Sequence, residues 1–253
     1  MLSENQIAEY NERGFVTPDF RLPDASLQKI RELHDKLISK HPEFYNYCPT
    51  LLAYDTDFLE IAKNKDILDM VAQVIGADVA LWNSSFFAKP ANGGHATPWH
   101  QDGEYWPIEP LATCTVWIAI DKATPENGCL EVIPGSHREQ RLKRHNTNSS
   151  KDLTLNQEID ASEYDAERAE PIELEAGQVS LHDVFLVHGS DANHSDNPRR
   201  GMTLRYMPTT SVFNRDKARR LATENNMTDH SNRTLYLLAG GDASGQNDFS
   251  VYH

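Results

Sequence analysis

The chain has 253 residues, 39% of them apolar, and a formal net charge of −14, which suits one large globular domain with its own core. The acidic balance disfavours nucleic acid and anionic membranes as partners, since both bind a basic protein surface. No apolar run approaches the roughly 18 residues that a membrane-spanning helix needs, so we expect no membrane partner.

The three cysteines, Cys48, Cys114 and Cys129, form no CxxC pair. The first segment has neither the basic start nor the apolar run of a secretory signal. An odd number of thiols without such a signal predicts free cysteines in a reducing compartment. We therefore expect a cytoplasmic protein, and the sequence indicates no oligomeric state.

Residues 1–78 are predicted to form a helical buttress. Ser3 followed three residues later by Gln6 predicts a capped first helix. Two further segments, 24–41 and 65–75, carry leucine, isoleucine, valine and methionine at helical spacing. We assign these apolar residues to the core.

From residue 79 the pattern changes to short runs that are rich in β-branched and aromatic residues and separated by Pro, Gly and Asn-Gly. The runs are 79–89, 113–120, 128–134, 178–189 and 201–208. Helices followed by strands favour an α+β fold or a barrel with helical buttresses. We assign 79–212 to the barrel within a single domain, 1–253.

Two polar segments accompany the barrel. Residues 138–170 are charged and nearly without periodicity, which predicts a long surface excursion between two strands. Residues 213–253 are also polar, with one helix-like stretch and a glycine-rich end. We expect at least one of these segments to act as a lid over the barrel mouth.

The first candidate metal ligands are His100 and Asp102 in "PWHQDGEYWP". Residues i and i+2 of a strand point to the same face, so this pair would aim an imidazole and a carboxylate at one point. The pair alone is weak evidence. Two histidines and one carboxylate form a facial triad on iron(II), which leaves open positions for a bidentate co-substrate and dioxygen.

Candidates for the third ligand lie between residues 179 and 201. His182 and His188 would share a face if they lay on one regular strand, and His194 falls in a polar turn. His188 precedes Gly189, where a side chain can turn into a barrel mouth, whereas His182 could equally be a core histidine bonded to backbone. Spacing alone favours His188 without deciding between the two.

Three segments carry a resemblance to a known family: "HQD", "VWIAIDKATPENGCLEVIPGSH" and "LVHGSDANHSDNPRRG". Their order and spacing closely resemble the phytanoyl-CoA dioxygenase family of iron(II)- and 2-oxoglutarate-dependent oxygenases, from about Phe86 to Tyr206. The resemblance implies a mainly β fold with flanking helices, the double-stranded β-helix or cupin-like jelly-roll barrel, with its site at the open end.

Carried over residue by residue, the resemblance implies that His100, Asp102 and His188 bind the metal. It therefore prefers His188 to His182. The implied metal is iron(II), and the implied co-substrates are 2-oxoglutarate and O2.

The resemblance also implies residues for the co-substrate. The family places an arginine eleven residues after the distal histidine, which makes Arg199 the partner of the distal carboxylate of 2-oxoglutarate, with Arg200 as the local competitor. A guanidinium forks onto a carboxylate and stays charged when buried. Ser190 is a second donor, Trp117 is a pocket-lining or core residue, and Lys89 is a weaker candidate with a surface lysine as its alternative.

The implied reaction is hydroxylation of an unactivated C–H bond, with release of succinate and CO2. Asp102 favours hydroxylation over halogenation, because halogenating relatives replace this carboxylate with a small residue. The alternatives are a catalytically silent or zinc-loaded barrel, and a metal-dependent hydrolase or cupin isomerase.

The expected substrate is a small, polar, amine-bearing metabolite: an amino acid, a betaine-like solute or an aminophosphonate. Glu104, Tyr105 and Trp106 follow the metal pair, and aromatic faces with a carboxylate suit an ammonium group. A phosphonate would also need a basic or amide-rich patch, for which Asn83 and Arg205 are the nearest candidates together with Lys89. An acyl-CoA or natural-product hydroxylase of the same family is the alternative.

Overall fold

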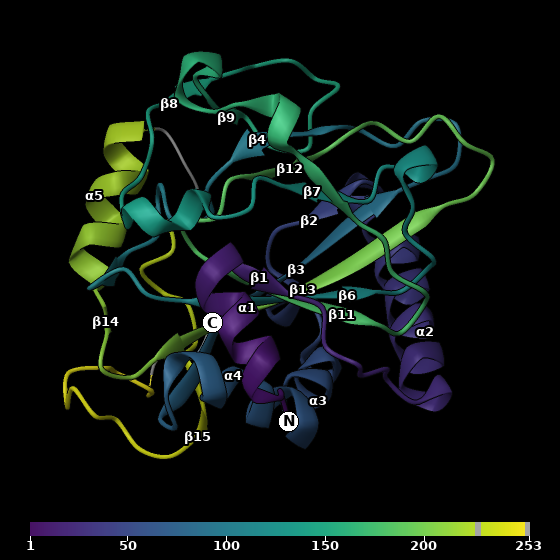
Figure 1. Ribbon diagram of the computed structural model, residues 1–253. Coiled ribbons are helices and arrows are strands. Elements are labelled where there is room, and N and C mark those ends of the chain that lie inside the picture. The colour runs from purple at the N-terminus through teal and green to yellow at the C-terminus, as the bar shows by residue number, and fades with distance from the viewer. Residues whose placement is uncertain (226–228, 251–253) are drawn as a thin grey trace.

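Two antiparallel sheets form the centre of the computed structural model, which describes residues 1–225 and 229–250 (Figure 1). The larger sheet has the order β1-β11-β6-β13-β3-β15, with β2 also paired to β3, and the smaller sheet has the order β10-β7-β12-β4. The larger sheet contains β1 (Phe15–Val16), β2 (Tyr47–Cys48), β3 (Val79–Lys89), β6 (Cys114–Ala119), β11 (Val179–Asp183), β13 (Arg199–Pro208) and β15 (Tyr236–Ala239). The smaller sheet contains β4 (Thr97–His100), β7 (Leu130–Val132), β10 (Glu170–Ile172) and β12 (His188–Ser190). The jelly-roll prediction is thereby confirmed.

Helices cover the face of the larger sheet that points away from the smaller one (Figure 1). They are α1 (Glu4–Arg13), α2 (Asp24–Lys40), α3 (Leu59–Ala62) and α4 (Lys65–Ile75), and α5 (Arg215–Asn225) follows the barrel. The capping box of α1 is present as predicted, with Ser3 and Gln6 bonding each other's backbone, and Gly14 ends the helix with φ 84°. The apolar sides of α2 and α4 pack with the outer sheet residues in one core.

Strand alternation sorts the larger sheet into an apolar and a polar face. On β13, Met202 and Leu204 belong to the core beneath the helices, whereas Thr203 and Arg205 point into the space between the sheets. On β6, Val116 likewise belongs to the core beneath the helices, whereas Thr115 and Trp117 line the space between the sheets. The space between the two sheets is therefore lined partly by polar side chains, and it holds the candidate site.

Three features differ from the sequence expectations. The run 178–189 is two strands rather than one, since the chain turns after β11 and enters β12 in the other sheet. The segment 138–170 holds a hairpin, β8 (His145–Thr147) paired with β9 (Gln157–Ile159). The segment after the barrel contributes β15, which pairs with β3 and so belongs to the larger sheet.

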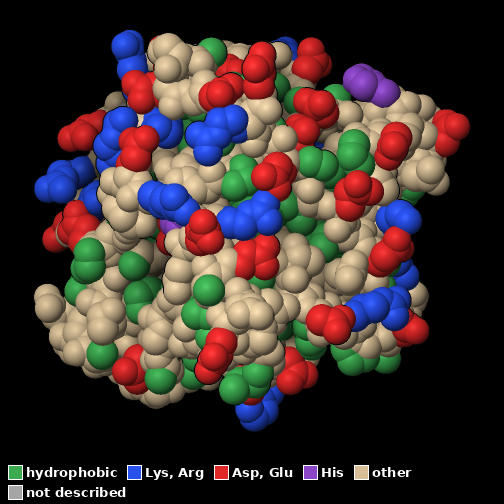
Figure 2. Space-filling view, viewed as in Figure 1, with side chains coloured by type: hydrophobic (Ala, Val, Ile, Leu, Met, Phe, Trp, Pro, Cys, Tyr) green, Lys and Arg blue, Asp and Glu red, His purple; other side chains and the backbone are tan. Residues whose placement is uncertain are grey.

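The surface and the thiols agree with the composition. Acidic and basic side chains are interspersed on the face shown in Figure 2. Cys48, Cys114 and Cys129 are all free and buried. Among the described residues, no helix is long and apolar enough to cross a membrane.

Candidate active site

Two histidines and one carboxylate meet between the sheets. His100 ends β4 and His188 begins β12, and the two are paired across the antiparallel register with ring centroids 4.2 Å apart. Asp102 lies in the turn that follows β4. The ligand atoms of these three buried residues all lie within 4.8 Å of one another. The structure thus brings together the three residues that the sequence singled out as metal ligands.

Both imidazoles have the tautomer that metal binding requires. Nδ1 of His100 donates to the carbonyl of Pro98 at 2.8 Å, and Nδ1 of His188 donates to the carbonyl of Leu186 at 2.9 Å. A neutral ring that donates through Nδ1 carries its lone pair on Nε2. Burial lowers the pKa of His100 to about 4 and that of His188 well below its usual value, so both rings are neutral at pH 7. Two neutral nitrogens and one carboxylate are a donor set that iron(II) accepts.

Asp102 is held in its charged form by its surroundings. Burial alone would raise its pKa, but Arg205, His182 and His188 outweigh burial and hold the pKa well below its usual range. The Thr115 hydroxyl donates to Oδ2 at 2.9 Å, and Nη2 of Arg205 lies 3.6 Å from Oδ1. The carboxylate is therefore fixed in position by residues of the larger sheet.

His182 approaches the cluster from the opposite sheet. Its ring centroid lies 4.9 Å from that of His188, and its Nε2 lies 3.5 Å from Asp102 Oδ2. Neither ring nitrogen has a hydrogen-bond partner among the described residues, so the expectation of a backbone-bonded core histidine is not met. The two histidines do not share a strand face, because β11 and β12 belong to different sheets.

Arg199 is a buried cation without a matching anion. Its side chain is 2% exposed, and its guanidinium carbon lies 5.4 Å from the Trp117 ring centroid. Nε donates to the carbonyl of Gly128 at 3.0 Å and Nη1 to that of Phe87 at 3.1 Å. Burial lowers its pKa to about 10, which still leaves it charged at pH 7. Among the described residues, no carboxylate lies within ion-pair distance of it, although it lines the same cavity as the metal cluster.

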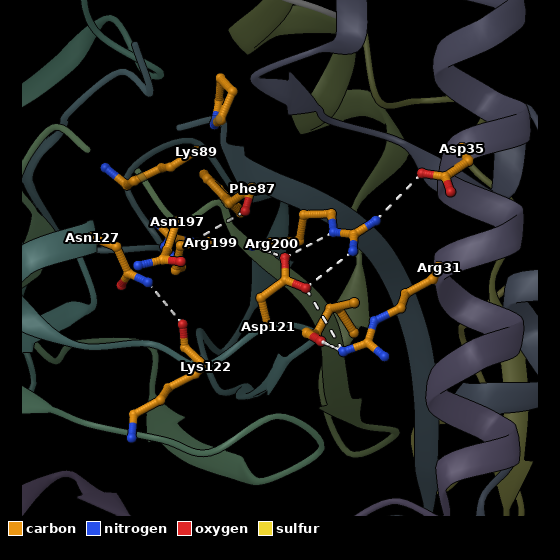
Figure 3. A network of polar contacts seen from close by, with 12 residues as sticks. Arg31, Asp35, Phe87, Lys89, Asp121, Lys122, Asn127, Asn197, Arg199 and Arg200 are labelled. Carbon is orange, nitrogen blue, oxygen red and sulfur yellow. Dashed lines mark hydrogen bonds and ion pairs between the residues drawn. The ribbon is translucent and has the colours of Figure 1, made fainter. Parts of the chain in front are cut away.

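The neighbouring Arg200 points the other way (Figure 3). It binds Asp121 through Nε at 2.8 Å and Nη2 at 3.0 Å, and it reaches Asp35 of α2 at 3.3 Å. Adjacent residues of a strand face opposite sides. Arg199 therefore faces the cavity, and Arg200 faces the helices.

The other candidates for the co-substrate differ in where they lie. Trp117 lines the cavity and packs so closely on Gly201 that a Cβ there would lie 2.2 Å from its ring. The Lys89 ammonium donates to the carbonyls of His95, Ser190 and Asp191 and does not line this cavity.

Lys89 is the last residue of β3 in the larger sheet, and Ser190 is the last residue of β12 in the smaller sheet. Burial, and then the charge of Arg199, lower the pKa of Lys89 to about 6. Ser190 lies two residues beyond His188 on β12, opposite Thr97 of β4. Lys89 thus ties the end of β3 to the exit of β12, and Ser190, like Lys89, is not among the residues that line the cavity of the metal cluster.

A second cavity of about 520 Å³ opens outward from His100 and Asp102. Four of the residues predicted to contact substrate line it, namely Asn83, Tyr105, Trp106 and Arg205. Most residues from 148 to 157 in the insertion form another part of its wall.

Glu104 lies outside that lining. Its Oε2 is 3.3 Å from Nδ1 of His145, which belongs to the insertion hairpin. Sequence reasoning gave no role to Arg233, which lines the cavity from the segment after α5. Arg205, which the sequence had suggested as a basic candidate, lies on the inner face of β13, whereas no local pattern identifies Arg233.

Known protein families and solved structures agree with this fold and this metal cluster. A family model described as phytanoyl-CoA dioxygenase (PhyH) matches residues 10–201. The chain belongs to the phytanoyl-CoA dioxygenase family. Iron(II) and 2-oxoglutarate are the cofactor and co-substrate of this family of dioxygenases, and O2 is its second co-substrate. The family predicted from the sequence motifs is confirmed.

Several characterised sequences are similar to this one. A "methylphosphonate hydroxylase" of Gimesia maris is 28% identical over 81% of this chain and 80% of its own length. A "probable alpha-ketoglutarate-dependent hypophosphite dioxygenase" of Stutzerimonas stutzeri is 30% identical over 58% of this chain. The human peroxisomal phytanoyl-CoA dioxygenase is 25% identical over 81% of this chain. The chain spans only about half the length of several relatives, 51% to 55%.

Solved structures share the fold. The non-heme monooxygenase ThoJ matches 98% of this chain and 86% of its own with a TM-score of 0.73 at 23% identity. The carbocyclase SnoK from nogalamycin biosynthesis matches 84% of this chain and 86% of its own with a TM-score of 0.70 at 22% identity. At these identities the likeness concerns the fold alone.

Proposed function

We propose that the protein is an iron(II)- and 2-oxoglutarate-dependent dioxygenase that hydroxylates an unactivated C–H bond of a small polar metabolite, releasing succinate and CO2. The observation that carries the proposal is Arg199, a buried cation without a carboxylate partner in the cavity of the His100, Asp102 and His188 cluster. A dicarboxylate could bind a metal at this cluster through one end and reach Arg199 with its other carboxylate. The metal would then gain a ligand, and the buried cation would gain an anionic partner.

In this mechanism the chain holds, orients and shields the reactants. The Nε2 lone pairs of His100 and His188 and the Asp102 carboxylate would bind iron(II), which when bound supplies the redox chemistry that couples decarboxylation of 2-oxoglutarate to C–H oxidation. The Thr115 hydroxyl fixes one oxygen of Asp102. Arg199 would hold the far carboxylate of the co-substrate through two parallel hydrogen bonds.

The outer cavity, which is the second cavity that opens outward from His100 and Asp102, has a lining that favours an anionic substrate. Glu104, the carboxylate that favoured an ammonium group, contacts His145 instead of lining the cavity. Three cations line it, Lys151, Arg205 and Arg233, with asparagine and glutamine amides between them. Its volume of about 520 Å³ lies within the usual range for small-molecule sites.

We therefore narrow the substrate to an organophosphonate, with aminophosphonates kept as its zwitterionic members. The similarity to a methylphosphonate hydroxylase over most of both chains supports this class. Among the described residues that line the cavity, Asp102 is the only carboxylate, and it belongs to the metal cluster, so an amine without an anionic group would have only aromatic faces and neutral polar groups to contact.

Succinate release tests the proposal. The protein is incubated with iron(II), ascorbate and 2-oxoglutarate, and with a panel of methylphosphonate, 2-aminoethylphosphonate, amino acids, glycine betaine and an acyl-CoA thioester. We expect substrate-dependent succinate with a phosphonate and none with the His100→Ala variant. Turnover of the thioester alone would replace the substrate class, and no consumption of 2-oxoglutarate under any condition would overturn the dioxygenase.

A further inference from the structure

Two guanidiniums line the outer cavity beyond the part of the chain that the family model covers. Arg205 comes from β13 and Arg233 from the segment after α5, whereas the family match ends at residue 201. Neither arginine is one of the three candidate metal ligands. Arg205 lies on the same strand as Arg199 but six residues further along. Arg205 also holds the Asp102 carboxylate of the metal cluster, whereas Arg233 has no part in the shared dioxygenase chemistry.

A hydrogen-bond chain connects the two arginines through β3. Nη1 of Arg233 donates to Oδ1 of Asn83 at 2.7 Å, and Nδ2 of Asn83 donates to Oγ of Ser85 at 3.4 Å. Nη1 of Arg205 also donates to this Ser85 oxygen, at 2.5 Å. Each guanidinium is therefore bonded to one of two linked residues of β3, Arg233 to Asn83 and Arg205 to Ser85.

A pair of tryptophans supports the same two cations. The guanidinium carbon of Arg233 lies 5.8 Å from the Trp82 ring centroid, and that of Arg205 lies 5.2 Å from the Trp106 centroid. The two rings contact each other edge to face, with centroids 4.6 Å apart. Cations held over aromatic faces are fixed in place without being neutralised.

Negative charge around the two cations is scarce. Arg233 has no carboxylate within 4 Å among the described residues, and its Nε donates instead to Nδ1 of His230 at 2.9 Å. Burial, followed by the charge of Arg233, lowers the pKa of His230 to about 3, so this partner is neutral. Arg205 has only Asp102, at 3.6 Å, and that carboxylate belongs to the metal cluster.

On each cation one N–H group has no acceptor among the described residues. Nε of Arg205 is buried without a hydrogen-bond partner among the described residues. Arg233 uses Nε and Nη1 for His230 and Asn83, and no described residue accepts from its Nη2. Two oriented donors on two cations suit an oxyanion with several acceptor oxygens.

We propose that Arg233 and Arg205 form an anion site, separate from Arg199, that binds the phosphonate group of the substrate and sets which carbon lies nearest the metal. The inference rests on the proposed function and deepens it. Its ligand is a small organic phosphonate, whose three oxygens can accept from both guanidiniums. A carboxylate of similar size offers one acceptor oxygen fewer and should bind less tightly.

The sharpest test is Asn83→Asp, a change of nearly the same shape. It gives Arg233 an internal carboxylate that competes with a ligand anion, and it leaves the metal cluster and Arg199 intact. Methylphosphonate and 2-oxoglutarate are titrated calorimetrically into anaerobic, iron(II)-loaded protein, so that binding is measured without turnover. We expect the variant to bind methylphosphonate at least about tenfold more weakly, the scale of one lost charge-assisted interaction, with 2-oxoglutarate binding unchanged.

Two further variants separate charge from geometry. Arg233→Lys keeps the charge but loses the planar fork, so its affinity for methylphosphonate should fall between those of wild type and Asn83→Asp. Arg220→Gln removes a charge from an exposed position of α5 that does not line the cavity, and it should bind like wild type.

Unchanged methylphosphonate binding in both Asn83→Asp and Arg233→Lys would overturn the inference. So would a wild-type protein that binds 2-oxoglutarate but not methylphosphonate, and in that case the dioxygenase proposal would stand. Failure of the wild type to bind 2-oxoglutarate would instead overturn the proposed function.

Discussion

Replacing Arg199 with alanine should weaken binding of 2-oxoglutarate without weakening binding of the metal. Arg199 is 2% exposed and has no carboxylate partner in the part of the chain that the structure describes, so the co-substrate would supply the anion that it lacks. Losing one member of a buried charge pair costs about 2–5 kcal/mol. At about 1.4 kcal/mol per factor of ten, this corresponds to a rise in KM of roughly 30-fold to a few thousand-fold.

Arg200→Ala is the matched control, since it removes the same side chain one position along β13. That change breaks the bonds to Asp121 and Asp35 on the helical side, so it should lower the stability while leaving the KM for 2-oxoglutarate unchanged. The stability of Arg199→Ala must also be measured, because the carbonyls of Gly128 and Phe87 lose their donor.

The assay is succinate formation against 2-oxoglutarate concentration at saturating iron(II), with iron affinity and thermal unfolding measured in parallel. A raised KM in Arg200→Ala together with a normal KM in Arg199→Ala would refute the assignment of the two faces. A normal KM in both variants would refute the role of Arg199 as the carboxylate partner.

Further outcomes follow from other parts of the structure. His100→Ala should abolish 2-oxoglutarate turnover and lower iron(II) affinity in equilibrium dialysis, because two remaining ligands rarely hold this metal. Gly201→Ala should destabilise the protein by about 1–3 kcal/mol in urea unfolding, as expected for overpacking, because its Cβ would lie 2.2 Å from the Trp117 ring. Burial lowers the pKa of His34 in the folded protein to about 4. Between about pH 6.5 and pH 4 the unfolded chain therefore binds a proton at His34 that the folded chain does not, so the stability should fall as the pH drops through this range. His34→Phe should flatten that part of the profile, and a profile identical to wild type would contradict it. Hydrogen exchange in residues 138–170 should slow when 2-oxoglutarate and substrate are both bound, whereas equal protection would argue against a lid.

The fold could be predicted where local signals agree with tertiary packing. The Ser3 and Gln6 capping box and the runs of β-branched and aromatic residues in β3 and β13 are such cases. The sequence predicts one strand for 178–189, because the turn between β11 and β12, Val184 to Val187, is as apolar as the strands on either side of it. The pairing of β15 with β3 depends on contacts far apart in sequence, so nothing in its own residues indicated it.

Some residues of the candidate site could be predicted from local motifs, and others could not. His100, Asp102, His188 and Arg199 lie in motifs with fixed spacing, and motif resemblance was enough to name them. Glu104 could not be placed, because the chain turns directly after β4 and the alternation of a strand no longer applies.

Arg233 escaped prediction for a different reason. It lies in a polar segment without periodicity, and it reaches the cavity only through its contacts with Asn83 and Trp82. A polar residue in such a segment has no local signal that separates a cavity wall from an exposed surface.

The family match ends at residue 201, inside β13, while part of the cavity wall comes from residues beyond it. The metal cluster and Arg199 lie within the shared region, whereas Arg205 and Arg233 lie after it. With the proposed anion site, part of the substrate choice would lie after the region that the family model matches, whereas Asn83, Trp106 and the insertion wall lie within it. A chimera that joins residues 1–201 to the corresponding end of a relative without these two arginines should keep 2-oxoglutarate turnover while losing the binding preference for a phosphonate over a carboxylate.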